Sequence, residues 1–86
     1  MTLQELKRAL DTGNVSPNCY SLTSDGYGEI YRINRVTDIL GDGWEVYYAE
    51  RGSKNQLVVF RSESEACEHF YRWITSDHTV HRPNRS

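Results

Sequence analysis

The chain has 86 residues, of which 37% are hydrophobic and 26% are charged, and its formal net charge at pH 7 is −2. A domain this short buries only about 60 to 65% of its unfolded surface, so we expect one domain with a modest core and no deep catalytic pocket. The apolar and charged fractions are typical of a soluble globular domain and exclude an intrinsically disordered chain.

Charge is distributed unevenly along the chain. Residues 1–77 contain eight Lys and Arg against twelve Asp and Glu, whereas residues 78–86 contain Arg82 and Arg85 and no acidic residue. An acidic folded part attracts a phosphate backbone only weakly, so nucleic acid is not an expected partner. No apolar run approaches the length of a membrane span, and the amphipathic start MTLQELKRAL is unlike a signal peptide, so we expect a cytoplasmic protein without membrane contact.

The first predicted element is a short helix at the N-terminus. The segment Thr2–Glu5 has the pattern of a capping box, leucines follow at helical spacing, and Gly13 is a natural stop. Residues 14–28 are rich in Gly, Ser and Asn and contain a proline, so they predict a loop. We expect Tyr20 and Leu22 to anchor this loop to the core.

Three strands are expected in the middle of the chain. Residues 29–36 are rich in β-branched and aromatic side chains, and Asp42-Gly43 is typical of a turn. Residues 44–50 then form the second strand, and residues 56–61 form the third after a polar loop at residues 51–55. The pattern predicts an antiparallel meander of three strands, with a four-stranded sheet as the alternative.

The second predicted strand has two different faces, because successive side chains of a strand point to opposite sides. Trp44, Val46 and Tyr48 share one face, which is wholly apolar or aromatic, so we expect it to lie in the core. The other face carries Glu45 and Tyr47. One long and one short helix cannot cover both faces of a sheet, so we expect the Tyr47 face to stay exposed.

A second helix is predicted over residues 62–75. Ser62 and Glu65 have the spacing of a capping box, and Glu68 and Arg72 are placed for an ion pair on the outer face. The side chains that repeat at helical spacing and should be buried are Ala66, Cys67, Phe70, Trp73 and Ile74.

These elements predict an α+β fold in which the short N-terminal helix and the longer C-terminal helix pack on one face of the sheet. Residues 1–77 should form the domain and residues 78–86 a flexible tail, because the tail has no hydrophobic periodicity. His78 and His81 fall in this tail, where we interpret them as solvated histidines and not as metal ligands.

No residue pattern indicates catalysis or a cofactor. Cys19 and Cys67 lack the spacing of a zinc site, and the sequence leaves a disulfide between them open. No serine has the context of an activated nucleophile, so an enzyme is not expected.

The order of these segments resembles that of small immunity proteins of bacterial polymorphic toxin systems. The similarity covers about residues 3 to 75, and it is most recognisable in WEVYYAERG, residues 44–52, and in FRSESEAC, residues 60–67. The resemblance implies a non-enzymatic inhibitor that binds a cognate secreted toxin domain and occludes its active site.

An acidic, rigid domain suits this role because opposite charge speeds the encounter with a basic partner. The alternative is a protein-interaction or regulatory module that has no toxin partner. In either case we expect the partner to touch exposed residues on turns or on the open face of the sheet. The predicted contact residues are Asp25, Glu29, Tyr47, Glu50 and Arg51.

Overall fold

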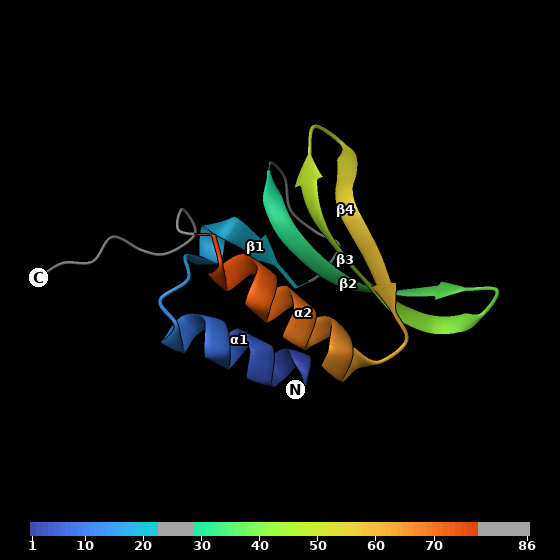
Figure 1. Ribbon diagram of the computed structural model, residues 1–86, viewed down its shortest axis with the longest axis horizontal. Helices are drawn as coiled ribbons and strands as arrows, with labels where there is room; N and C mark the ends of the chain where they lie inside the picture. The colour runs from blue at the N-terminus through green and yellow to red at the C-terminus, as the bar shows by residue number, and fades with distance from the viewer. Residues whose placement is uncertain (23–28, 78–86) are drawn as a thin grey trace, which may run out of the picture.

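The structure is a computed structural model that describes residues 1–22 and 29–77 (Figure 1). It has the predicted α+β fold, with two helices on one face of a four-stranded sheet. The elements in chain order are α1 (Leu3–Thr12), the short 3₁₀ helix η1 (Pro17–Cys19), β1 (Tyr20–Ser21), β2 (Ile30–Asp38), β3 (Gly41–Glu50), β4 (Ser53–Phe60) and α2 (Glu63–Thr75). The predicted tail at residues 78–86 lies outside the described residues.

The sheet is mixed, with strand order β1-β2-β3-β4. The three long strands form the predicted antiparallel meander, and β1 adds a fourth strand that runs parallel to β2, with Tyr20 opposite Tyr31. Tyr20 is only 8% exposed and Leu22 packs against the core. The prediction that these two side chains anchor the loop is therefore confirmed.

The two hairpin turns are shorter than predicted. Between β3 and β4 only Arg51 and Gly52 form the turn, and both have positive φ, 49° and 81°. Such angles are those of the two-residue turn whose twist matches paired antiparallel strands, and a glycine adopts them without strain. The residues predicted as a loop beyond Gly52 belong to β4 instead.

The turn between β2 and β3 is Ile39-Leu40, and not Asp42-Gly43 as predicted. Asp42 and Gly43 lie inside β3, paired with β2 residues. A Cβ atom added to Gly43 would come within 3.1 Å of the Phe60 carbonyl oxygen. Gly43 therefore leaves room for the backbone of β4 to pack closely against β3, and it is not part of the turn.

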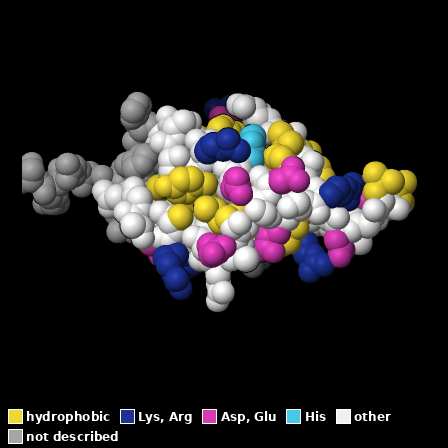
Figure 2. All heavy atoms as spheres, turned by 60° about the horizontal axis from the view of Figure 1, so that its bottom comes forward, with side chains coloured by type: hydrophobic (Ala, Val, Ile, Leu, Met, Phe, Trp, Pro, Cys, Tyr) yellow, Lys and Arg dark blue, Asp and Glu magenta, His cyan; other side chains and the backbone are white. Residues whose placement is uncertain are grey.

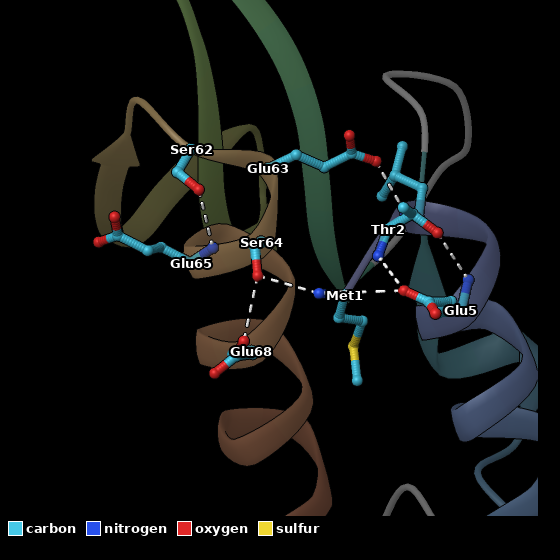
Figure 3. A network of polar contacts seen from close by, with 9 residues as sticks. Met1, Thr2, Glu5, Ser62, Glu63, Ser64, Glu65 and Glu68 are labelled. Carbon is cyan, nitrogen blue, oxygen red and sulfur yellow. Dashed lines mark hydrogen bonds and ion pairs between the residues drawn. The ribbon is translucent and has the colours of Figure 1, made fainter.

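Helices α1 and α2 lie side by side with their N-terminal ends together (Figures 1 and 3). The capping box of α1 is present: Glu5 N–H donates to Thr2 Oγ1 at 3.2 Å, and Thr2 N–H donates to the Glu5 carboxylate at 2.8 Å. Leu3 N–H donates to the Glu63 carboxylate across the helix pair, at 2.8 Å. Carboxylates at two adjacent N-termini compensate the positive ends of both helix dipoles.

At the start of α2, the Ser62 hydroxyl accepts from Glu65 N–H, as the predicted cap requires. The predicted outer pair is different. Arg72 Nε donates to the backbone carbonyl of Glu68, while the Glu68 carboxylate accepts from the Ser64 hydroxyl. Helix α2 is therefore stabilised at this point by hydrogen bonds and not by the expected ion pair.

The core lies between the helices and the sheet. The predicted stripe of α2 is buried except for Trp73, which is partly buried. Cys19 and Cys67 are both free, so the open question of a disulfide is answered in the negative. The buried cluster contains Leu6, Leu10, Val15, Tyr20, Tyr31, Ile33, Val46, Ala66, Cys67, Phe70 and Ile74.

The end of the β2–β3 hairpin projects beyond the helices as an arm (Figure 1). Two exposed ion pairs lie on this arm: Arg61, which follows β4, donates to Asp38 beside the turn at 2.9 Å, and Arg35 of β2 donates to Asp42 of β3 at 2.6 Å. The hydrogen bonds from Arg61 lower the pKa of Asp38 below its ordinary value of 3.8, with a further contribution from Leu40 N–H. The folded state therefore favours the charged form of this carboxyl group.

We expect Arg61→Ala to raise the pKa of Asp38 towards 3.8, its ordinary value. Because the folded pKa is the lower one, the stabilising contribution is present above this ordinary value and is lost as the pH falls through the folded pKa. A carbon-detected NMR titration of the Asp38 carboxyl measures the shift. Arg35→Ala is the matched control, since it acts first on Asp42; an unchanged Asp38 titration in Arg61→Ala would contradict the assignment.

Candidate protein-binding surface

Three of the five predicted contact residues lie exposed at the same end of the sheet. Glu50 ends β3, and Arg51 follows it in the turn. Glu29 precedes Ile30, which pairs with Ala49 of β3, so Glu29 lies beside this end as well. Asp25 lies outside the described residues.

Tyr47 is not exposed, so the prediction that its face of the sheet remains open is wrong. Its side chain is 6% exposed, and Arg32, which is opposite it on β2, is 8% exposed. Lys54 Nζ lies 5.1 Å from the Tyr47 ring centroid and donates to the Glu45 carboxylate at 2.8 Å. Asn34 donates to the same carboxylate at 3.1 Å. Long polar side chains thus close the face that no described helix covers.

Of the two adjacent tyrosines of β3, Tyr48 is the more accessible: it is partly buried, on the face that carries the helices. Its ring is edge-to-face with the ring of Tyr31, with centroids 5.0 Å apart. The Tyr31 ring is also edge-to-face with the indole of Trp73, at 4.8 Å. Three aromatic side chains from β2, β3 and α2 therefore form one continuous cluster, in a geometry that aromatic pairs prefer.

Carboxylates surround this cluster. Burial raises the pKa of Tyr48, and the negative charges of Glu29, Glu50 and Asp77 raise it further. The Tyr31 hydroxyl donates to the Asp77 carboxylate at 2.8 Å, and burial together with this hydrogen bond raises the pKa of Tyr31 strongly. The phenols are therefore neutral at pH 7, and the electrostatic potential around them is negative.

A hollow of about 410 Å³ opens at this point between the end of α2 and the β3–β4 hairpin. We call it the aromatic hollow. Its volume is within the range of small ligand sites, about 300 to 1,000 Å³. Its lining consists of Tyr31, Tyr48, Glu50, Asn55, Gln56, Trp73 and Asp77.

A second surface lies along β4, the strand at one edge of the sheet. Leu57, Val58 and Val59 are exposed by 45%, 39% and 44%. Gln56 and Leu57 together oppose the single residue Tyr47, which makes a β-bulge, and Gln56 has a positive φ of 56°. Bulges and lysines at edge strands limit uncontrolled pairing, but Leu57 at the bulge and the next two residues, Val58 and Val59, stay exposed.

The arm carries the most exposed apolar side chains. Ile39 is 101% exposed and Leu40 is 77% exposed. Figure 2 shows hydrophobic side chains at the tip of the arm, at the right of the molecule, next to charged ones. These two residues are neighbours in a turn, and they form a small isolated tip and not a continuous patch.

The described side chains offer little reactive chemistry. Cys67 is fully buried, and burial raises the pKa of its thiol to about 11, so it is protonated at neutral pH. Burial and the nearby Arg72 lower the pKa of His69, which favours the neutral imidazole. Within residues 1–22 and 29–77, no group of three or more His, Cys, Asp and Glu is arranged to hold a metal ion.

In the described part of the chain, no helix has the length and apolar character needed to cross a membrane. Comparison with protein-family models, curated proteins and solved structures finds no match. The sequence identified Glu50 and Arg51 beside the aromatic hollow as candidate contact residues. It did not identify β4 as an edge strand of the sheet.

Proposed function

We propose that this chain is an immunity protein that binds a cognate secreted toxin domain and occludes its active site. The observation that carries the proposal is the open apolar edge of β4. A partner strand can pair with such an edge through main-chain hydrogen bonds, while the side chains on both faces supply specificity.

The edge is suited to a protein partner because three consecutive apolar side chains, Leu57, Val58 and Val59, are exposed on it. Leu57 and Val59 point to one side of the sheet and Val58 points to the other, as the alternation of a strand requires. Contiguous exposed apolar side chains of this kind mark interaction sites in monomeric proteins.

The charge of the neighbouring end of the sheet indicates the character of the partner. Glu29 and Glu50 are exposed beside the β3–β4 turn, close to the start of β4. Carboxylates at the rim of an interface speed the encounter with a basic protein and orient it. We therefore expect a toxin domain with a basic surface around its active site and an exposed strand beside it.

The test is coexpression of this chain with the toxin domain encoded beside it, scored by growth and by copurification. We expect Leu57→Lys with Val59→Lys to weaken the complex by about 100-fold or more, because buried lysines would lose hydrophobic contacts and remain unpaired. Toxicity should then return. Both side chains are about half exposed in the free protein, so its thermal unfolding should change little.

Ile39→Lys with Leu40→Lys is the matched control, since it places the same two charges on side chains that are more exposed and lie at the arm. This variant should protect as well as the unmodified chain. If the β4 variant also protects, the β4 edge is not the docking site. If the unmodified chain neither binds the toxin domain nor restores growth, the proposed function is wrong.

A further inference from the structure

We propose that the aromatic hollow binds an arginine side chain of a partner protein. Only the identity of the partner, a toxin domain that presents the arginine, rests on the proposed function. Binding of a guanidinium group by the hollow is a property of the free chain.

The walls of the hollow have the composition that cations prefer. Tyr31, Tyr48 and Trp73 supply three aromatic rings within one cluster, with successive centroids 5.0 Å and 4.8 Å apart. A cation within about 6 Å of such a ring centroid is attracted by the negative face of the ring, and Trp and Tyr are effective in this role.

The charges at the hollow have the sign that a cation requires. Glu50 and Asp77 line it, and Glu50 forms no ion pair with any residue that the structure describes. Asp77 follows the C-terminal end of α2, where the helix dipole adds partial negative charge. The negative potential that raises the pKa of Tyr48 comes from the same carboxylates, with Glu29.

Lys54 and Arg51 are the described basic residues near this end of the sheet, and neither lines the hollow. Lys54 is engaged on the opposite face of the sheet, where it contacts Glu45 and the Tyr47 ring. Arg51 lies in the adjoining turn and is exposed, but it does not line the hollow. Within residues 1–22 and 29–77, the lining of the hollow is therefore acidic and aromatic and contains no Lys or Arg.

A guanidinium group fits this combination better than an ammonium group. It is planar and weakly hydrated, so it stacks on aromatic rings, and its five N–H donors can meet a carboxylate in two parallel hydrogen bonds. The side-chain amides of Asn55 and Gln56 add carbonyl acceptors to the lining. Glu50 can supply the carboxylate, and the rings of Tyr48 and Trp73 in the lining can supply the aromatic surface.

The experiment is an NMR titration of the ¹⁵N-labelled free chain with N-acetyl-arginine amide, with N-acetyl-citrulline amide as the neutral analogue of the same shape. We expect the arginine compound to shift the Trp73 indole N–H and the amides of Tyr48 and Glu50, and the citrulline compound to have little effect. Equal shifts from both compounds, or shifts spread over the whole surface, would overturn the proposal.

Glu50→Gln should weaken binding of the arginine compound by about threefold to tenfold, the range of one exposed charge contact. Glu65→Gln is the control, because it removes the same charge from an exposed position at the other end of α2. Tyr48→Leu keeps an apolar side chain but removes the aromatic face, and it should abolish the Trp73 shift in a folded protein. Unchanged binding in Glu50→Gln and Tyr48→Leu would exclude the hollow.

The same titration separates this inference from the proposed function. If the free chain binds arginine but forms no toxin complex, the proposed immunity function is contradicted and the arginine site in the hollow is supported. A toxin complex that forms normally, with no response of the hollow to the arginine compound, would contradict the site alone.

Discussion

Phe70→Ala is expected to lower the free energy of unfolding by about 3 to 5 kcal/mol, the range measured when a fully buried aromatic side chain is removed. Phe70 is the largest fully buried side chain of the described chain, with 0% exposure, and its ring is 6.4 Å from the Tyr31 ring in an edge-to-face arrangement. It joins α2 to the sheet. Since small domains are stable by only about 5 to 15 kcal/mol, the variant should be marginally folded.

Urea unfolding followed by circular dichroism measures this effect, with the midpoint expected to fall and the slope to remain similar. Arg72→Ala on the same helix is the matched control: its side chain is exposed, and we expect a change within about 0.5 kcal/mol. If Phe70→Ala unfolded at the same urea concentration as the unmodified chain, Phe70 would not be the central contact between α2 and the sheet.

The helices could be predicted from the sequence because their signals are local. Thr2 and Glu5 form the expected capping box, and Ser62 caps α2 through the Glu65 N–H. Each of these hydrogen bonds joins residues three apart, so it depends little on the rest of the fold.

The turns and the sheet edges depend on distant contacts, and here the sequence was less informative. Asp42-Gly43 has the pattern of a turn, but the structure uses its glycine for the approach of Phe60 from β4. Tyr20 was expected in a loop, and it forms a two-residue strand only because β2 lies beside it. Neither contact is visible in a window of neighbouring residues.

The sequence predicted only part of the candidate site, because its accessibility also depends on contacts between distant residues. Alternation along β3 correctly separates Tyr47 from Tyr48, because a strand places successive side chains on opposite faces. Alternation does not show which face water reaches. Arg32 and Lys54, from two other strands, cover Tyr47, while α2 leaves Tyr48 at the margin of the core.

Tyr47→Ala is therefore expected to act on stability and not directly on recognition, with a loss of about 3 kcal/mol in the free energy of unfolding. Tyr47 is only 6% exposed, and removal of its ring would also leave the Lys54 ammonium without the ring that it now contacts at 5.1 Å. Urea unfolding measures the loss. A toxin complex that fails in this variant would thus report a weakened fold.

Tyr47→Phe is the control that separates the two roles, because it keeps the ring in place and removes only the hydroxyl. We expect its stability to stay within about 1 kcal/mol of the unmodified chain, and its binding to the proposed toxin partner to be unchanged. The opposite pattern, a stable Tyr47→Ala that has lost the toxin complex, would make Tyr47 a direct contact. Docking would then involve the face of the sheet that Arg32 and Lys54 close in the free chain, and those side chains would have to move aside on binding.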